Sequence, residues 1–174
     1  MYKTYTVNAF PLGGQPAFRA DTIPPLPAQS GPKLTLDKSS GQNVYVQGAG
    51  HDGTIDLTTR DFIYTTGLFQ CFAVCAVWEK VDETFQHGYL AHVSSPGPSK
   101  PKLGGPQPFF RTAIANIPDD AWIVVGVGVE GWVPIIAKAL QDGGHADDHI
   151  WIYNRAEKTD VGFGIDKYGR FGET

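Results

Sequence analysis

The feature that most constrains the fold is a dense apolar run, Phe-Ala-Val-Cys-Ala-Val-Trp, from Phe72 to Trp78. Its content of valine and aromatic residues favours a strand buried on both faces, although a buried helix of this length is also compatible with the pattern. A polar connection from Glu79 to Gln86 follows, and Gly88 to Val93 has the pattern of a second strand. We therefore expect residues 71 to 78 and 88 to 93 to form an antiparallel hairpin.

Shorter patterns predict the remaining elements. A helix is expected where apolar residues recur at helical spacing, and it should stop at a Gly-Gly pair. Strands are expected in short runs rich in Val, Ile and aromatic residues. The order of these elements predicts an α+β domain of mixed, mostly antiparallel β-sheets packed with helices. The expected strands are 34–36, 44–46, 121–129 and 150–153, the helix is 132–140 before Gly143 and Gly144, and a terminal hairpin turns at Lys167 to Gly169.

The chain has the length and apolar content of one domain. It holds 174 residues, 41% of them hydrophobic, which is enough to bury a core. We expect a single catalytic domain over residues 1–174, with residues 1–40 forming an irregular N-terminal arm, rich in Pro and Gly, that packs on it. Residues 94–108 are equally rich in Pro and Gly and predict a long loop, either functional or a simple crossover.

The charge pattern limits the classes of partner. Charged residues make up 18% of the chain, the net charge is −4, and no cluster of Lys and Arg is present. This excludes the basic surface expected of a nucleic-acid binder. The first residues lack the apolar core of a signal peptide, and no run approaches the roughly 18 apolar residues of a membrane span. We expect a soluble protein without a membrane span; secretion by a non-classical route, or delivery into a host cell, stays open.

The two cysteines, Cys71 and Cys75, are too few for a disulfide framework and lack the second pair of a zinc site. On a strand, positions four apart are separated by about 13 Å, which is too far for a disulfide, and only a helix would allow that bridge. We therefore expect two reduced thiols.

One of these thiols has a histidine in a favourable position. If the hairpin turns between Val81 and Asp82, Cys71 lies directly opposite His92. Directly opposed residues share a face of the sheet, with Cβ atoms about 4.5 to 5.5 Å apart. An imidazole in that position lowers the pKa of the thiol and can protonate a leaving amine. A buried thiol beside a buried histidine without catalytic function is the alternative.

The surrounding sequence resembles a known family. Thr65 lies six residues before Cys71, an apolar strand follows the cysteine, and Gly88-Tyr-Leu-Ala-His92-Val comes next. This arrangement is similar to the active-site segment of CheD, the chemoreceptor glutamine deamidase. The deamidase toxins of the cytotoxic necrotizing factor type share the same cysteine and histidine arrangement. A weaker similarity extends to the closing segment from Phe163 to Phe171.

The resemblance implies a protein-glutamine deamidase that forms a thioester intermediate. It implies that Cys71 is the nucleophile, that His92 is the base and acid, and that Thr65 orients the imidazole. Backbone N–H groups of Gln70 and Cys71 would form the oxyanion hole. The implied partner is a protein that presents a glutamine side chain, and no cofactor or metal is required.

Alternatives to this function remain. Phe69 and Gln70 stand where the family has small residues, and this departure, with the proline-rich arm, favours a bacterial effector or toxin acting on a host protein over a CheD-type chemotaxis enzyme. A cysteine protease or small-molecule amidase would use the same Cys71 and His92. A binding module without catalytic function would keep the fold with an inert Cys71.

The other polar candidates have structural interpretations. Cys75 would oppose Gly88 and is expected to be a core residue. His87 fits a loop or hairpin edge, and His51 a turn. The segment His145-Ala-Asp147-Asp148-His149 has metal-ligand types but is expected to be a solvated loop. Gly126 to Gly131 lacks the spacing of a nucleotide-binding loop.

Overall fold

The computed structural model describes residues 43–94, 108–127, 132–154 and 162–173, and these residues form two β-sheets with helices. The expected arm, the strand at 34–36 and most of the 94–108 loop lie outside the described residues. The described helices are α1 (Pro108–Ala115) and α2 (Val133–Asp142), with a short 3₁₀ turn over Asp147–His149. The expectation of a mixed α+β fold is confirmed.

The nine described strands divide between a small and a large sheet. Two neighbouring pairs, β1 with β3 and β6 with β7, are parallel, and the other neighbours are antiparallel. The small sheet has the order β1 (Asn43–Val46), β3 (Phe62–Thr65), β8 (Phe163–Asp166), β9 (Phe171–Glu173). The large sheet has the order β2 (His51–Asp56), β5 (Thr84–Val93), β4 (Phe72–Val81), β6 (Trp122–Val127), β7 (Ile150–Asn154).

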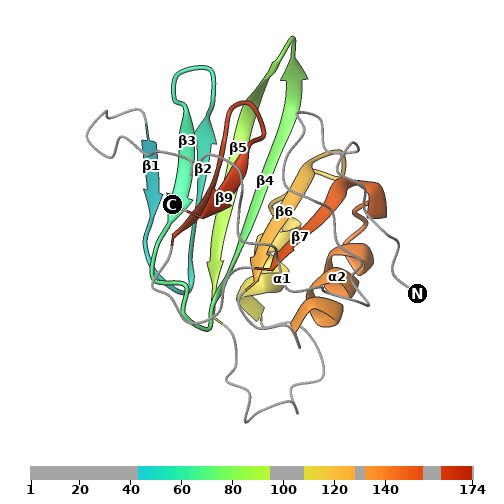
Figure 1. The fold of residues 1–174 in the computed structure, drawn as a ribbon. Helices are drawn as coiled ribbons and strands as arrows, with labels where there is room; N and C mark the ends of the chain where they lie inside the picture. The colour runs from blue at the N-terminus through green and yellow to red at the C-terminus, as the bar shows by residue number, and fades with distance from the viewer. Residues whose placement is uncertain (1–42, 95–107, 128–131, 155–161, 174) are drawn as a thin grey trace.

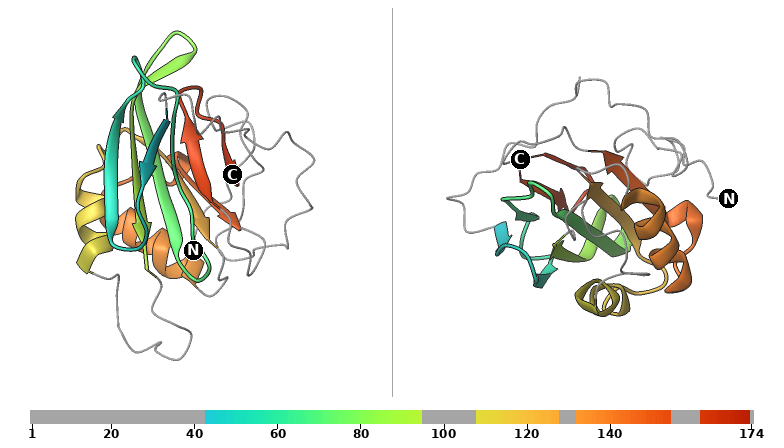
Figure 2. Two further views of the ribbon diagram at one scale, coloured as in Figure 1. Left: turned by 90° about the vertical axis from the view of Figure 1, so that its left-hand side faces the viewer. Right: turned by 90° about the horizontal axis from the view of Figure 1, so that it is seen from below.

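The large sheet is the middle layer of three (Figure 1). Adjacent residues of β4 show this, because side chains alternate between the two faces. Phe72 packs edge-on against Phe110 of α1, with ring centroids 5.1 Å apart. Ala73 pairs with Gly126 of β6, and a Cβ on that glycine would come within 2.8 Å of the Phe163 ring from β8. The helices therefore cover one face of the large sheet and the small sheet covers the other (Figure 2).

The central hairpin is present, but its predicted register is wrong. Strands β4 and β5 extend further than expected and meet in a turn at Asp82 and Glu83, so His92 pairs with Ala73 and not with Cys71. The turn uses a positive φ of 53° at Asp82, a conformation that residues other than Gly adopt rarely. The shift is two residues, and an even shift leaves each side chain on its predicted face.

Several predictions in the last third are confirmed. The structure contains the strand β6, the helix α2 and the strand β7 close to their predicted bounds. Helix α2 ends at Gly143, and Gly144 has a φ of +97°, which glycine adopts without strain. The terminal hairpin turns over residues 167–169, where the Asp166 carboxylate accepts hydrogen bonds from the backbone N–H groups of Tyr168 and Arg170. Among the described residues, no helix is long and apolar enough to cross a membrane.

Candidate active site

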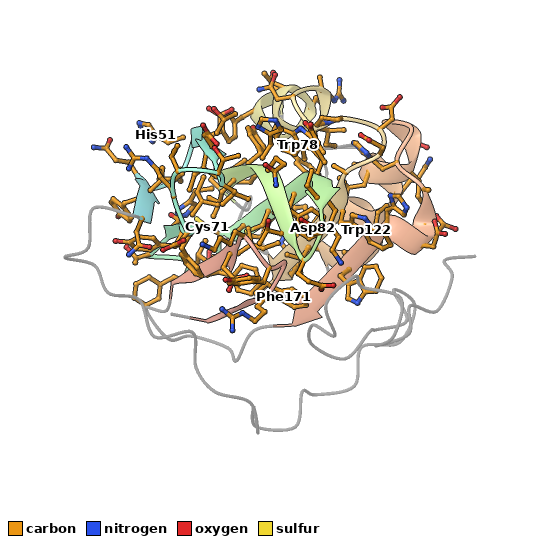
Figure 3. The ribbon with its side chains drawn as sticks, turned by 90° about the horizontal axis from the view of Figure 1, so that it is seen from above. His51, Cys71, Trp78, Asp82, Trp122 and Phe171 are labelled. Atoms are coloured by element: carbon orange, nitrogen blue, oxygen red, sulfur yellow. The ribbon has the colours of Figure 1, made fainter. Side chains whose placement is uncertain are left out.

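The three residues with predicted catalytic roles lie at one end of the two packed sheets. Thr65 is the last residue of β3 in the small sheet, and His92 is the penultimate residue of β5 in the large sheet. Cys71 directly precedes β4, which pairs with β5. The site is therefore formed where the ends of the two sheets meet, and Cys71 and His51 lie on the same side of the view in Figure 3.

Thr65 and His92 are in direct contact. The Thr65 Oγ1 lies 2.8 Å from His92 Nδ1, and the two side chains are 0% and 1% exposed. The same hydroxyl donates a hydrogen bond of 2.9 Å to the backbone carbonyl of Val46 in β1. The resemblance implies that Thr65 orients the imidazole. The contact that this role requires is present.

These two hydrogen bonds fix the proton positions on the imidazole. A threonine hydroxyl has one proton, and Thr65 gives it to the Val46 carbonyl. The hydroxyl oxygen must therefore accept the proton of His92 Nδ1–H. In the neutral imidazole the other nitrogen, Nε2, then has the lone pair. This is the tautomer that a general base needs if Nε2 is to accept a proton from a thiol.

Cys71 occupies a diagonal position relative to His92. Ala73 lies opposite His92. Alternation continued one residue before the start of β4 would put position 71 on the same face as Ala73. Diagonal neighbours across a strand pair are about 7 to 8 Å apart at Cα, a separation that long side chains can bridge. Cys71 is partly exposed, whereas Phe72 beside it is buried. Cys71 is therefore accessible from solvent and directly precedes the strand that pairs with the strand of His92.

The row of residues beside His92 is unusually small. Ala73 and Gly126 lie next to it on β4 and β6, and both are on the face that the small sheet covers. Phe163 of β8 packs over Gly126, and Phe163 pairs with Thr65 in the small sheet. Small residues in the large sheet thus allow the close approach that brings Thr65 onto His92.

His51 lies at the same end of the sheets as His92, and the expectation that it is a turn residue is wrong. It is the first residue of β2 and not a turn residue, and it lies directly opposite His92. Its Nδ1 is 3.0 Å from the Gly48 carbonyl, and its side chain is exposed. The segment His-Asp-Gly-Thr-Ile-Asp alternates too weakly to predict a strand, so the pairing could not be foreseen.

The segment between β3 and β4 presents the cysteine. Gly67 adopts a φ of +75°, which favours glycine, and Leu68 is fully buried. Phe69 and Gln70 are exposed and lie in a bend. Gly67 and the buried Leu68 thus set the direction of the chain before Cys71. In the families that this segment resembles, small residues stand directly before the cysteine. The oxyanion role of the Gln70 and Cys71 N–H groups stays a prediction.

The second thiol is in a different environment. Cys75 is fully buried and pairs with Leu90 and Val124, not with Gly88 as predicted. Burial raises the pKa of its thiol far above the usual range, because the surroundings disfavour a thiolate. Neither cysteine forms a disulfide. The environment of Cys75 is that of a core residue.

Two of the remaining histidines stack on tryptophan rings, and the third is buried. His87 lies on β5, not in a loop, where it stacks on Trp78 at 5.7 Å between centroids and contacts Glu79 at 3.0 Å. His149 stacks on Trp122 at 4.1 Å, and His145 is buried, so the expected solvated loop is wrong. In the part of the chain that the structure describes, no three His, Cys, Asp or Glu residues are grouped to hold a metal ion.

Sequence comparison finds no family model that matches the chain and no curated protein similar enough to count as a relative. The function proposed below therefore depends on the residues, their geometry and the local resemblance of the active-site segment.

Proposed function

We propose that this protein is a cysteine-dependent amidohydrolase that deamidates glutamine side chains of a protein substrate. The observation that carries the proposal is the chain of hydrogen bonds from His92 Nδ1 through Thr65 to the Val46 carbonyl, with Cys71 directly before the adjacent strand β4. Burial between two sheets restrains the imidazole, and the hydroxyl selects its tautomer.

Acylation begins with the thiol proton. His92 Nε2 accepts the proton from Cys71 Sγ, and the thiolate attacks the carboxamide carbon. The carbonyl oxygen becomes an oxyanion, which the N–H groups of Gln70 and Cys71 would stabilise. The tetrahedral intermediate collapses with cleavage of the C–N bond. The His92 imidazolium returns the proton to the departing nitrogen, so ammonia leaves and a thioester remains.

Deacylation uses the same residues. His92 Nε2 removes a proton from water, and the resulting hydroxide attacks the thioester carbon. The C–S bond breaks, the sulfur regains its proton, and the glutamine has become glutamate. An amine in place of water would give a transamidated product.

The departure at Phe69 and Gln70 favours an effector or toxin acting on a host protein over a chemotaxis enzyme.

The test compares the two cysteines. Cys71→Ser removes the nucleophile and should lower turnover by about 10⁴-fold or more. Cys75→Ser buries a hydroxyl in the core, so it should lower the free energy of unfolding by about 1–3 kcal/mol and leave turnover per folded molecule largely unchanged. Activity is measured as conversion of glutamine to glutamate in a host-cell protein extract, mapped by peptide mass spectrometry.

Three results would contradict the proposal. One is an extract in which no glutamine is converted in a Cys71-dependent manner. Another is a folded, inactive Cys75→Ser protein alongside an active Cys71→Ser protein, which would reverse the assignment of the nucleophile. The third is Cys71-dependent cleavage of peptide bonds without deamidation, which would identify a protease.

A further inference from the structure

The loop that leads to Cys71 carries an exposed aromatic side chain. Phe69 is 55% exposed, the largest exposure among the large hydrophobic residues of the described chain. Its neighbour Leu68 is fully buried in the core. Phe69 therefore projects into solvent two residues before the proposed nucleophile.

A second exposed aromatic residue is attached to the same loop. Tyr45 of β1 is 49% exposed, and its hydroxyl lies 3.1 Å from Thr66 Oγ1. Thr66 directly follows Thr65 and begins the loop that contains Phe69. Tyr45 also packs on Tyr64 at 5.2 Å between ring centroids. We call Tyr45 and Phe69 the aromatic rim.

The two chain segments that carry the aromatic rim have no formally charged residue. Residues 45–51 and 66–71 contain no Asp, Glu, Lys or Arg. The opposite end of β4 is different, because the exposed Val81 stands among Glu79, Lys80, Asp82 and Glu83. Single exposed apolar residues are common and need no functional explanation. Phe69 and Tyr45 are a different case, because Phe69 lies two residues before the proposed nucleophile and Tyr45 contacts the loop that carries it. Rigid aromatic side chains give large contact area at low entropic cost.

We infer that the aromatic rim is the substrate-positioning surface of the proposed reaction and that it contacts an apolar side chain next to the target glutamine. The inference rests on the proposed function and narrows its substrate class to glutamines flanked by apolar residues. Uncharged segments would give no selectivity for an acidic or basic neighbour. Apolar contact would hold the carboxamide over Cys71 before bond formation, which lowers KM.

The test alkylates Cys71 with two reagents that differ by one aromatic group. Iodoacetamide is small, and N-benzyl iodoacetamide carries a ring next to its carboxamide. Phe69→Ala should slow the N-benzyl reagent by about threefold to tenfold, the value of one aromatic contact. It should change the iodoacetamide rate by less than about twofold, since the thiol itself is unaltered. Peptide mapping assigns the rate to Cys71 and not to Cys75.

Matched variants separate recognition from reactivity. Val81→Ala removes an equally exposed apolar side chain at the far end of β4 and should change neither rate. Tyr45→Ala should repeat the selective loss, and Phe69→Gln, which keeps side-chain length, should resemble Phe69→Ala. A circular dichroism spectrum of each variant verifies folding.

The inference is overturned if Phe69→Ala and Tyr45→Ala both leave the ratio of the two rates unchanged, or if Val81→Ala changes it equally. Its failure is separate from failure of the proposed function. If Cys71-dependent deamidation is found but the variants show no reagent selectivity, only the substrate-positioning role of the aromatic rim is refuted. If the variants show reagent selectivity but no Cys71-dependent deamidation is found, the proposed reaction is refuted and the aromatic rim is an apolar binding surface.

Discussion

Two histidines are buried in the described part of the molecule, and their surroundings differ. His92 is 1% exposed and lies between the two sheets, where Thr65 contacts its Nδ1. His145 is 3% exposed and follows α2. Burial lowers the pKa of His145. A backbone hydrogen bond with Ile114 and the charge of Asp119 raise it, but by less than burial lowers it. Burial alone therefore does not distinguish the two histidines, whereas the Thr65 hydroxyl on Nδ1 does.

The largest difference in turnover should be between variants of His92 and variants of His145. His92→Ala removes the general base and acid, so turnover should fall by about 10²- to 10⁴-fold. His145→Asn should leave turnover per folded molecule unchanged. The readout is Cys71-dependent conversion of glutamine, normalised to folded protein by circular dichroism. Unchanged turnover per folded molecule in His92→Ala would mean that His92 has only a structural role.

Thr65 should have an intermediate effect as a positioning residue. Thr65→Ala removes the acceptor for His92 Nδ1–H and should lower kcat by roughly 10- to 1,000-fold, part of the general-base contribution. Thr65→Ser keeps the hydroxyl and should restore most of the activity. Thr66→Ala is the matched control, because Thr66 contacts Tyr45 and not His92, so its kcat should change much less.

A purely structural role for Thr65 would give a different pattern. Thr65→Ala would then reduce the free energy of unfolding without lowering kcat, and Thr65→Ser would restore stability but change no rate. That pattern would reduce the site to Cys71 and His92.

The smallest expected effect concerns the pH dependence of stability at His145. Its folded pKa lies below the ordinary value of 6.5, so the unfolded chain binds more protons as the pH falls below that value. Stability should therefore fall as the pH decreases through the range from the unfolded to the folded pKa. His145→Asn should flatten this dependence in urea unfolding compared at about pH 7.5 and about pH 5.5. An unchanged slope would show that His145 does not titrate on unfolding.

The sequence predicts the strands and the helix of the last third because their apolar periodicity is strong and glycines mark their ends. It predicts the wrong register for the central hairpin for a local reason. Glu79 and Asp82 adopt positive φ without the Gly or Asn that usually marks such turns. A charged segment that looks like a loop is in fact the paired end of two long strands.

The candidate site is predicted in part. The resemblance indicates Thr65, Cys71 and His92, and residue spacing alone puts the last two on one face. Nothing in the sequence indicates that β1 supplies the Val46 carbonyl or that His51 pairs with His92, because these contacts join strands through sheet topology. Helix α1, which follows a proline-rich segment, was also not predicted.

Because the candidate site takes residues from both sheets, the chain should gain activity only late in folding. The β4–β5 hairpin can bring Cys71 near His92 through local contacts, which form early. The Thr65 hydroxyl reaches the imidazole only after β1, β3 and β8 have assembled and docked. An intermediate with the hairpin formed and the small sheet undocked would have the nucleophile without the oriented base. Such an intermediate would be inactive, so recovery of turnover after dilution from denaturant would lag behind formation of the hairpin.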